Sequence, residues 1–267
     1  MTGETLHVRT FGDDTGAPVV AVHGVYGYGG RWRGLAAEHL AGFCVHAPDL
    51  RGQGLSSWSP PWTLEQHVAD LVATMDGLGL RQVDLLGFSF GAALSLHLAR
   101  HAPERVRRLV LLDPAIGLGT EAAARSAEKA LAAPSFLDPA EARAAYAKSW
   151  PSVPPSGLDE EVADHLVRGG DGRWRWRFEP ESIATAYTEM ARPPVLPPSG
   201  VPTLLVRATR SDVVNPKYLA ACRAAGVEVA DVDSGHQLLL ECPAETGALI
   251  RKFLDAQAGE RTWRTEA

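Results

Sequence analysis

The sequence predicts an α/β fold with a mostly parallel sheet and helices on both of its faces. Short apolar runs such as Val19–Val22 and Val83–Phe88 alternate with segments of helical spacing. Parallel neighbours in a sheet need a crossover connection, which is usually a helix. The runs are almost wholly apolar instead of alternating with polar residues, which is typical of strands that helices cover on both faces.

The expected elements follow one another in strand–helix order through the first 113 residues. Strands are expected at 19–22, 43–47, 83–88 and 109–112. Helices are expected at 31–40, from Thr63 onward and at 92–101. The helix after Thr63 has apolar residues at i, i+3 and i+4 spacing; they are Leu64, Val68, Leu71, Val72, Met75 and Leu78. After residue 200 the same order resumes, with strands at 203–208 and 227–232 and helices at 216–225 and 243–256.

Residues 114–200 interrupt this order. No convincing strand is expected there, and four helical stretches with proline-rich joints are expected at 121–132, 139–150, 159–167 and 180–191. Arg and aromatic residues alternate from Arg173 to Phe178, which indicates a short extended segment. We therefore expect a core at 1–113 and 201–256, a helical cap at 114–200 and a flexible polar tail at 257–267.

The sequence Gly87-Phe-Ser89-Phe-Gly91 lies between the predicted strand 83–88 and the helix that begins near Ala92. In a strand–turn–helix elbow the central Ser has a strained backbone, and the flanking glycines avoid clashes of Cβ atoms. Such a turn lifts the hydroxyl above the carboxyl ends of the strands, where open α/β sheets bind ligands. Ser89 is therefore the predicted nucleophile.

A serine hydroxyl needs a neighbouring base to take its proton. His236 comes directly after the strand 227–232, in Ser234-Gly235-His236, and should lie at the same edge of the sheet. Imidazole titrates near working pH, so His236 is the predicted base. His23 is expected to be a structural hydrogen-bonding residue.

A carboxylate should orient the imidazole and stabilise its charged form. Asp212 lies in the loop after strand 203–208 and Asp113 ends strand 109–112, so both belong at the carboxyl edge of the sheet. We favour Asp212, with Asp113 as the alternative. In its loop Asp212 could also be only a turn former or a helix cap.

The chain resembles the α/β-hydrolase superfamily, in the branch with a helical cap inserted between strands six and seven. The resemblance covers nearly the whole chain and depends on five landmarks in the order of that family: His23-Gly24, Asp49-Leu-Arg-Gly-Gln-Gly54-Leu-Ser56, Gly87–Gly91, Arg210-Ser-Asp212 and Gly235-His236. It implies the chain order Ser, Asp, His for the triad. It also implies that the 49–56 segment is a structural loop near the site.

In this family one backbone N–H of the oxyanion hole comes from the loop after the early strand, and the other from the residue after the nucleophile. In this chain these residues are Val25 and Phe90. Aromatic residues expected to face the substrate pocket are Tyr26, Tyr28, Phe88 and Phe90 from the core and Trp150, Trp174 and Trp176 from the cap.

The predicted function is a serine esterase that cleaves a small, mainly apolar carboxylic ester through an acyl-enzyme, without metal or organic cofactor. Ser89 argues against haloalkane dehalogenases and epoxide hydrolases, which resemble this chain but have Asp at that position. Lactone or thioester hydrolysis, perhydrolysis and C–C bond hydrolysis use similar machinery and stay open. A non-catalytic small-molecule receptor of the same fold is the alternative of a different class.

The composition bears on the expected binding partners, on metal and disulfide sites and on the location of the protein. The net charge is −6 and basic residues are scattered, so neither nucleic acid nor an anionic membrane surface is expected. The three cysteines form no disulfide framework or zinc motif. No secretory signal or run of about 18–20 apolar residues is apparent, so a cytoplasmic monomer or small homo-oligomer is expected.

Overall fold

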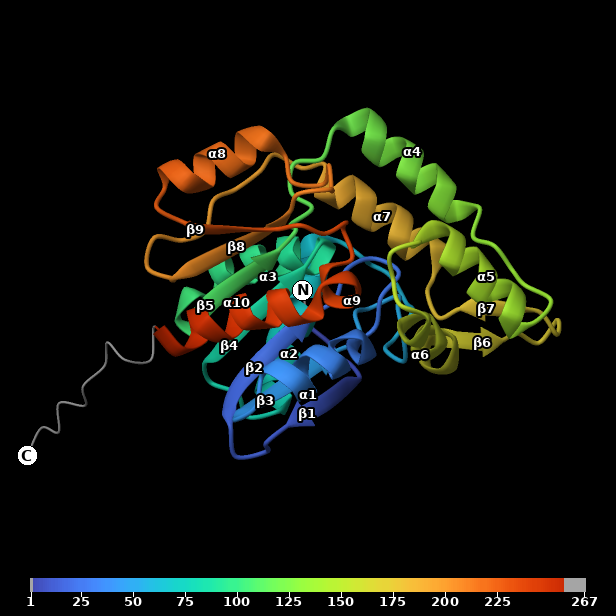
Figure 1. Cartoon of the computed structure of the whole chain (residues 1–267), viewed down its shortest axis with the longest axis horizontal. Helices are drawn as coiled ribbons and strands as arrows, with labels where there is room; N and C mark the ends of the chain where they lie inside the picture. Colours follow the sequence, from blue (N-terminus) through green and yellow to red (C-terminus); the bar gives the residue numbers. More distant parts are fainter. Residues whose placement is uncertain (1, 257–267) are drawn as a thin grey trace, which may run out of the picture.

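The computed structural model describes residues 2–256, and the predicted flexible tail at 257–267 lies outside this range. The main sheet has seven strands in the order β1-β3-β2-β4-β5-β8-β9 (Figure 1). Strand β1 is antiparallel to β3, and the other neighbours are parallel. The strand bounds are β1 Val8–Gly12, β2 Ala17–Val22, β3 Phe43–Pro48, β4 Val83–Phe88, β5 Val106–Leu112, β8 Thr203–Ala208 and β9 Glu228–Val232.

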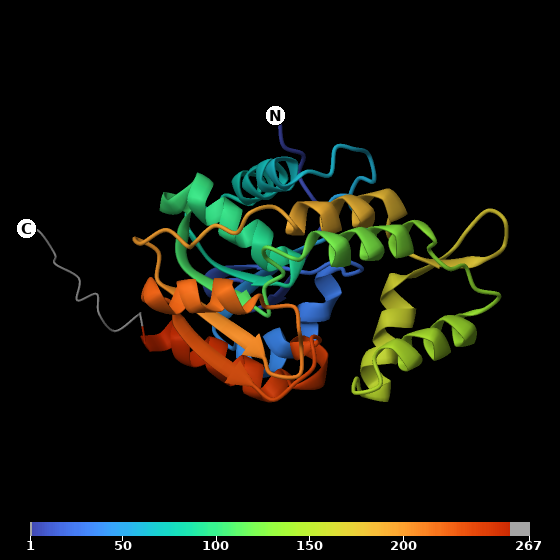
Figure 2. The ribbon, with the colours of Figure 1, turned by 90° about the horizontal axis from the view of Figure 1, so that it is seen from above.

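Helices cover both faces of this sheet. On one face, α2 (Leu64–Gly77), α3 (Phe90–His101) and α8 (Pro216–Ala224) pack against strand residues such as Leu85 and Leu111. On the other face, α1 (Arg33–His39) and α10 (Pro243–Ala256) pack against Leu86 and Val110 (Figure 2). Successive residues of the central strands thus enter opposite cores, so β2 is apolar throughout and β4, β5 and β8 are mainly apolar.

Residues 114–200, hereafter the inserted segment, lie between β5 and β8 and extend beyond the sheet at one side (Figures 1 and 2). The segment contains α4 Thr120–Leu131, α5 Pro139–Ser149, α6 Pro155–His165, β6 Leu166–Arg168, β7 Trp174–Trp176 and α7 Pro180–Met190. The four helices agree with prediction. The absence of strands was predicted wrongly, because β6 and β7 form an antiparallel hairpin that includes part of the expected extended segment.

Two further details differ from the sequence-based expectation. First, strand β1, which pairs with β3 at the edge of the sheet, was not predicted. Counted along the main sheet within residues 2–256, the inserted segment lies between the fifth strand, β5, and the sixth, β8, whereas the family resemblance placed it between strands six and seven. Three short helices complete the described chain: η1 Gly29–Trp32, η2 Pro103–Arg105 and α9 Leu238–Glu241.

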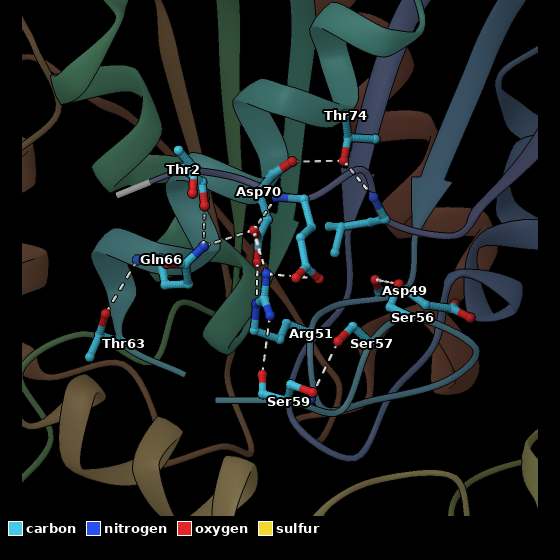
Figure 3. A network of polar contacts seen from close by, with 12 residues as sticks. Thr2, Asp49, Arg51, Ser56, Ser57, Ser59, Thr63, Gln66, Asp70 and Thr74 are labelled. Atoms are coloured by element: carbon cyan, nitrogen blue, oxygen red, sulfur yellow. Dashed lines mark hydrogen bonds and ion pairs between the residues drawn. The ribbon is translucent and has the colours of Figure 1, made fainter. Parts of the chain in front are cut away.

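The Asp49–Ser56 loop is held by a buried polar network (Figure 3). Arg51 forms a bidentate pair with Asp70 of α2, with Nε and Nη2 at 2.7 and 2.8 Å from the carboxylate oxygens. Asp49 accepts hydrogen bonds from the backbone N–H groups of Gly29 and Leu55 at 2.6 and 2.9 Å. These contacts fix the loop against the core.

The same loop also binds the inserted segment through its backbone. The N–H of Glu179 donates to the carbonyl of Gly52, and the N–H of Gly54 donates to the carbonyl of Arg177, both at 2.7 Å. The loop therefore joins the core to the inserted segment, in agreement with the structural role that the family resemblance implied. None of the helices within residues 2–256 has the length and apolar character that a membrane span requires.

Candidate active site

Ser89 occupies a sharp turn between β4 and α3. Its backbone has φ 56° and ψ −116°, a conformation that is costly for a residue with a side chain. The Ser89 N–H donates to the carbonyl of Leu112 at 2.9 Å, and the N–H groups of Ala92 and Ala93 donate to the Ser89 carbonyl. The residue is 4% exposed. Neighbouring backbone groups thus hold the strained turn in place.

Three glycines allow the close packing of backbone around this turn. A Cβ on Gly87 would lie 2.4 Å from the carbonyl oxygen of Gly91, and a Cβ on Gly91 would lie 2.3 Å from that of Val22. A Cβ on Gly24 would lie 2.9 Å from the Cβ of Ser89. Only glycine fits such approaches. The Gly-x-Ser-x-Gly pattern therefore has a steric reason here, and the loop after β2 passes directly beside Ser89.

The structure brings His236 to Ser89. His236 follows β9, and its Nε2 lies 2.9 Å from Ser89 Oγ. Its ring packs against the buried ring of Phe88, with centroids 4.9 Å apart. The side chain of His236 is 29% exposed. An imidazole with this geometry can take the proton of the hydroxyl.

Asp113 holds the other nitrogen of the imidazole. Its Oδ2 lies 2.6 Å from His236 Nδ1, and its side chain is fully buried. Asp113 Oδ1 accepts the N–H of Ala208 at 3.0 Å, and Ser211 Oγ donates to Oδ2 at 2.6 Å. Asp113 itself has a positive φ of 39° and directs its N–H to the carbonyl of Val206 at 2.7 Å. A fixed carboxylate at this position sets the tautomer and orientation of the ring.

The prediction that Asp212 orients His236 is wrong, and the alternative, Asp113, takes this position. Asp212 is exposed, whereas its neighbour Ser211 turns inward to Asp113. Strand β5 lies directly beside β4, so the residue after β5 lies close to Ser89. The sequence carried a signal for Asp113, namely its place directly after an apolar strand, but no signal for Ser211.

The two backbone amides predicted for an oxyanion hole lie in the expected elements. Val25 belongs to the loop that passes beside Ser89, and Phe90 is the first residue of α3. The first N–H groups of a helix have no partner within it, so the N–H of Phe90 is available for an anion. Val25 thus directly follows a glycine that lies beside Ser89, and Phe90 directly follows Ser89 in the chain.

His23 has a structural role, as predicted. Its Nδ1 donates to the carbonyl of Gly24 at 2.7 Å, and its Nε2 accepts the N–H of Leu50 at 2.9 Å. This arrangement needs a neutral ring. Burial lowers the pKa of His23 to about 4, in agreement with that state. His23 thereby fixes the loop that leads to Val25.

A cavity of about 310 Å³ lies within the inserted segment and reaches Tyr26 of the core. Its wall is mainly apolar and aromatic: Tyr26, Ala130, Ala133, Pro134, Phe136, Ala145, Tyr146, Trp150, Trp176, Phe178 and Tyr187, with Ser126, Lys129 and Ser149 as polar members. Cavities of this size and composition bind small apolar ligands. Since Tyr26 follows Val25 in the chain, one wall of the cavity is continuous with the loop beside Ser89.

Seven aromatic residues were predicted to face the pocket, and the structure separates them into two groups. Tyr26 and Trp150 line this cavity, as does Trp176. The other four have different positions. Phe88 packs under His236, and Phe90 is buried and lies edge-on to His67. Tyr28 is buried and stacks on His165 at 4.8 Å, and Trp174 pairs with Phe136 through the backbone instead of lining the cavity. Sequence alone does not show which way alternating Trp side chains point.

Within residues 2–256 no three His, Cys, Asp or Glu side chains are grouped closely enough to hold a metal ion.

Comparisons with known proteins agree with this architecture. The chain is 41% identical to Lipase LipV of Mycobacterium tuberculosis over 93% of its own length and 97% of that protein. It is 30% identical to the mouse sn-1-specific diacylglycerol lipase ABHD11, over 91% of this chain and 82% of that one. Among solved structures, E-2-(acetamidomethylene)succinate hydrolase superposes with a TM-score of 0.84 at 23% identity, covering 94% of this chain and 95% of the other. The family model described as alpha/beta hydrolase fold matches residues 17–151. The predicted fold is thus confirmed, and the chain belongs to the α/β hydrolase family.

Proposed function

We propose that this protein hydrolyses carboxylic esters through an acyl-enzyme formed on Ser89. The observation that carries the proposal is the continuous chain of contacts from Ser89 Oγ through His236 to the buried carboxylate of Asp113. Two relatives that match most of this chain have lipase in their names, which supports ester hydrolysis over the other reactions of the fold.

In the proposed reaction His236 Nε2 accepts the proton of Ser89 as Oγ attacks the acyl carbonyl. The carbonyl π electrons move to the oxygen, and Asp113 stabilises the imidazolium that forms. When the tetrahedral intermediate collapses, the C–O bond to the leaving alcohol breaks and His236 protonates that alcohol. A water molecule then repeats the sequence on the acyl-enzyme, releases the acid and restores Ser89.

The negative charge on the carbonyl oxygen needs fixed donors. We assign this role to the N–H groups of Val25 and Phe90, which the loop beside Ser89 and the start of α3 supply. Donors of this kind act mainly on the transition state, and loss of one typically costs ~10²–10³ in rate.

We assign the inserted segment the role of a cap that supplies the acyl pocket. The cavity of about 310 Å³ that Tyr26 shares with Trp150 and Trp176 suits an apolar acyl chain. In this assignment the pocket of the inserted segment discriminates among acyl chains, while the residues that carry out the reaction lie in the core.

The test of this function is covalent labelling combined with turnover. A fluorophosphonate probe should modify the unaltered protein once, and peptide mass spectrometry should locate the adduct on Ser89. The labelled protein should lose hydrolysis of p-nitrophenyl esters in proportion to the fraction modified. A protein that turns over no ester, lactone or thioester, or that is labelled elsewhere, would refute the proposal.

Ser211 is proposed as a positioning residue for Asp113, because its hydroxyl donates to the same Oδ2 that contacts His236. Ser211→Ala should lower kcat by about three- to tenfold, since a hydrogen bond to a charged group is typically worth ~1.5–3 kcal/mol and part of it orients the carboxylate. Ser211→Thr keeps the hydroxyl and should restore most of kcat. Equal kcat in the Ala and Thr variants, with equal melting temperatures, would show that the hydroxyl has no such role.

A further inference from the structure

Arg31 and Glu161 form a buried ion pair between the core and the inserted segment. Arg31 belongs to η1, and Glu161 to α6. Nε and Nη2 of Arg31 lie 2.7 and 2.8 Å from the two carboxylate oxygens, and each side chain is 2% exposed. The guanidinium also lies over the ring of Trp150 at 5.0 Å. Burial alone would lower the pKa of Arg31, but Glu161 raises it above its ordinary value, so the guanidinium keeps its charge.

Arg31 makes a third contact, and this one reaches the loop beside the serine. Its Nη2 donates to the backbone carbonyl of Tyr26 at 2.7 Å. Tyr26 has a φ of +59°, which is unfavourable for a residue with a bulky side chain and persists only where surrounding contacts hold it. The N–H of the same peptide group, that of Gly27, donates to Gln53 Oε1 at 3.1 Å. The peptide group that follows the strained residue is therefore held at both its carbonyl and its N–H.

Tyr26 directly follows Val25, whose N–H is one of the two proposed oxyanion donors. A change in the backbone of Tyr26 would turn the adjoining peptide and move Val25 relative to Ser89. Glu161 orients the guanidinium that holds Tyr26, so α6 acts on the same loop through two hydrogen bonds.

We propose that Arg31 is a positioning residue for the oxyanion loop, and that its pairing with Glu161 couples the docking of α6 to the geometry of that loop. This inference rests on the proposed function, because it concerns the transition state of the reaction on Ser89. According to this proposal Arg31 affects kcat although it is not one of the three residues Ser89, His236 and Asp113.

The effect of the Arg31–Glu161 pair on stability can be separated from its effect on catalysis. Replacing a buried ion pair by apolar residues of similar volume is often neutral or stabilising, whereas removal of one partner leaves a buried charge unpaired. The double variant Arg31→Met/Glu161→Met should therefore fold. It also lacks the donor to Tyr26, so we expect kcat for p-nitrophenyl acetate to fall by at least about tenfold while KM stays within about threefold. An interaction made mainly in the transition state lowers kcat rather than raising KM.

Arg33 offers a matched control. It also joins the core to α6, through Asp164 at 2.7 Å, but its side chain is 43% exposed and its described contacts do not include Tyr26. Arg33→Met should keep kcat within about twofold. If it lowers kcat as much as the double variant, then loose docking of α6 accounts for the loss and the positioning role is refuted.

A second variant covers the case in which the double variant does not fold. Arg31→Lys keeps a positive charge beside Glu161 but lacks the planar fork that reaches both carboxylate oxygens and the Tyr26 carbonyl. It should show the same direction of change, a lower kcat with nearly unchanged KM. Binding of a trifluoromethyl ketone, which forms a tetrahedral adduct with an oxyanion on the serine, should weaken by about the same factor as kcat.

The outcomes distinguish this inference from the proposed function. If the unaltered protein is labelled at Ser89 and turns over ester, but the folded Arg31 variants keep kcat and ketone affinity within twofold, only the positioning role is wrong. If the unaltered protein shows neither labelling at Ser89 nor turnover, the proposed function and this inference fail together.

Discussion

Asp113→Asn should reduce kcat by a factor approaching about 10⁴ while the protein stays folded. The amide has nearly the same shape and can still accept the N–H of Ala208, so little stability should be lost. An amide NH₂ facing Nδ1 of His236, however, favours the tautomer that carries its proton on Nε2. That nitrogen then cannot accept the proton of Ser89, and in serine proteases the corresponding change costs about this factor.

Asp212→Asn is the matched control for this substitution. It is the same chemical change in an exposed residue next to Ser211, so kcat should stay within about threefold of the parent. Initial rates on p-nitrophenyl acetate, with thermal melts of both variants, give the comparison. A loss of a hundredfold or more in Asp212→Asn, with Asp113→Asn nearly unaffected, would return the role of the acid to Asp212.

Ser89→Ala should abolish fluorophosphonate labelling and lower kcat by at least ~10³. Only the contributions of substrate binding and of the oxyanion donors would remain. Alanine also carries a Cβ, so the strained backbone of the turn is the same in both proteins and the fold should persist. Melting curves recorded beside the kinetics establish that the loss is chemical.

Ser95→Ala is a suitable control because Ser95 is a fully buried serine of the same helix α3. It should keep labelling and most of kcat. Labelling that persists in Ser89→Ala at another residue, or a kcat within tenfold of the parent, would remove Ser89 as the nucleophile.

The fold followed from local patterns. The mainly apolar runs at 83–88 and 203–208 form β4 and β8, because a strand that helices cover on both faces has apolar residues pointing to both sides. The elbow was also local in origin, since Gly87 and Gly91 flank Ser89 within five residues and the backbone leaves no room for other side chains. The alternation at 173–178 indicated the extended segment that contains β7, but the three-residue strand β6 and its pairing with β7 were not recognised.

The contacts at the site were decided by the tertiary structure. Asp113 and Asp212 both follow strands of the sheet, and the sequence cannot order those strands or show which neighbour in a loop turns inward. In the folded chain Ser211 faces Asp113 while Asp212 faces solvent. The link between Arg31 and Glu161 joins residues 130 positions apart. The sequence by itself determined the turn that bears Ser89 and the fold, because both depend on short-range sterics and periodic burial. The carboxylate partner of His236, the residues of the cavity wall and the contacts that support the Tyr26 loop depend on side-chain directions, which only the packing of distant segments fixes.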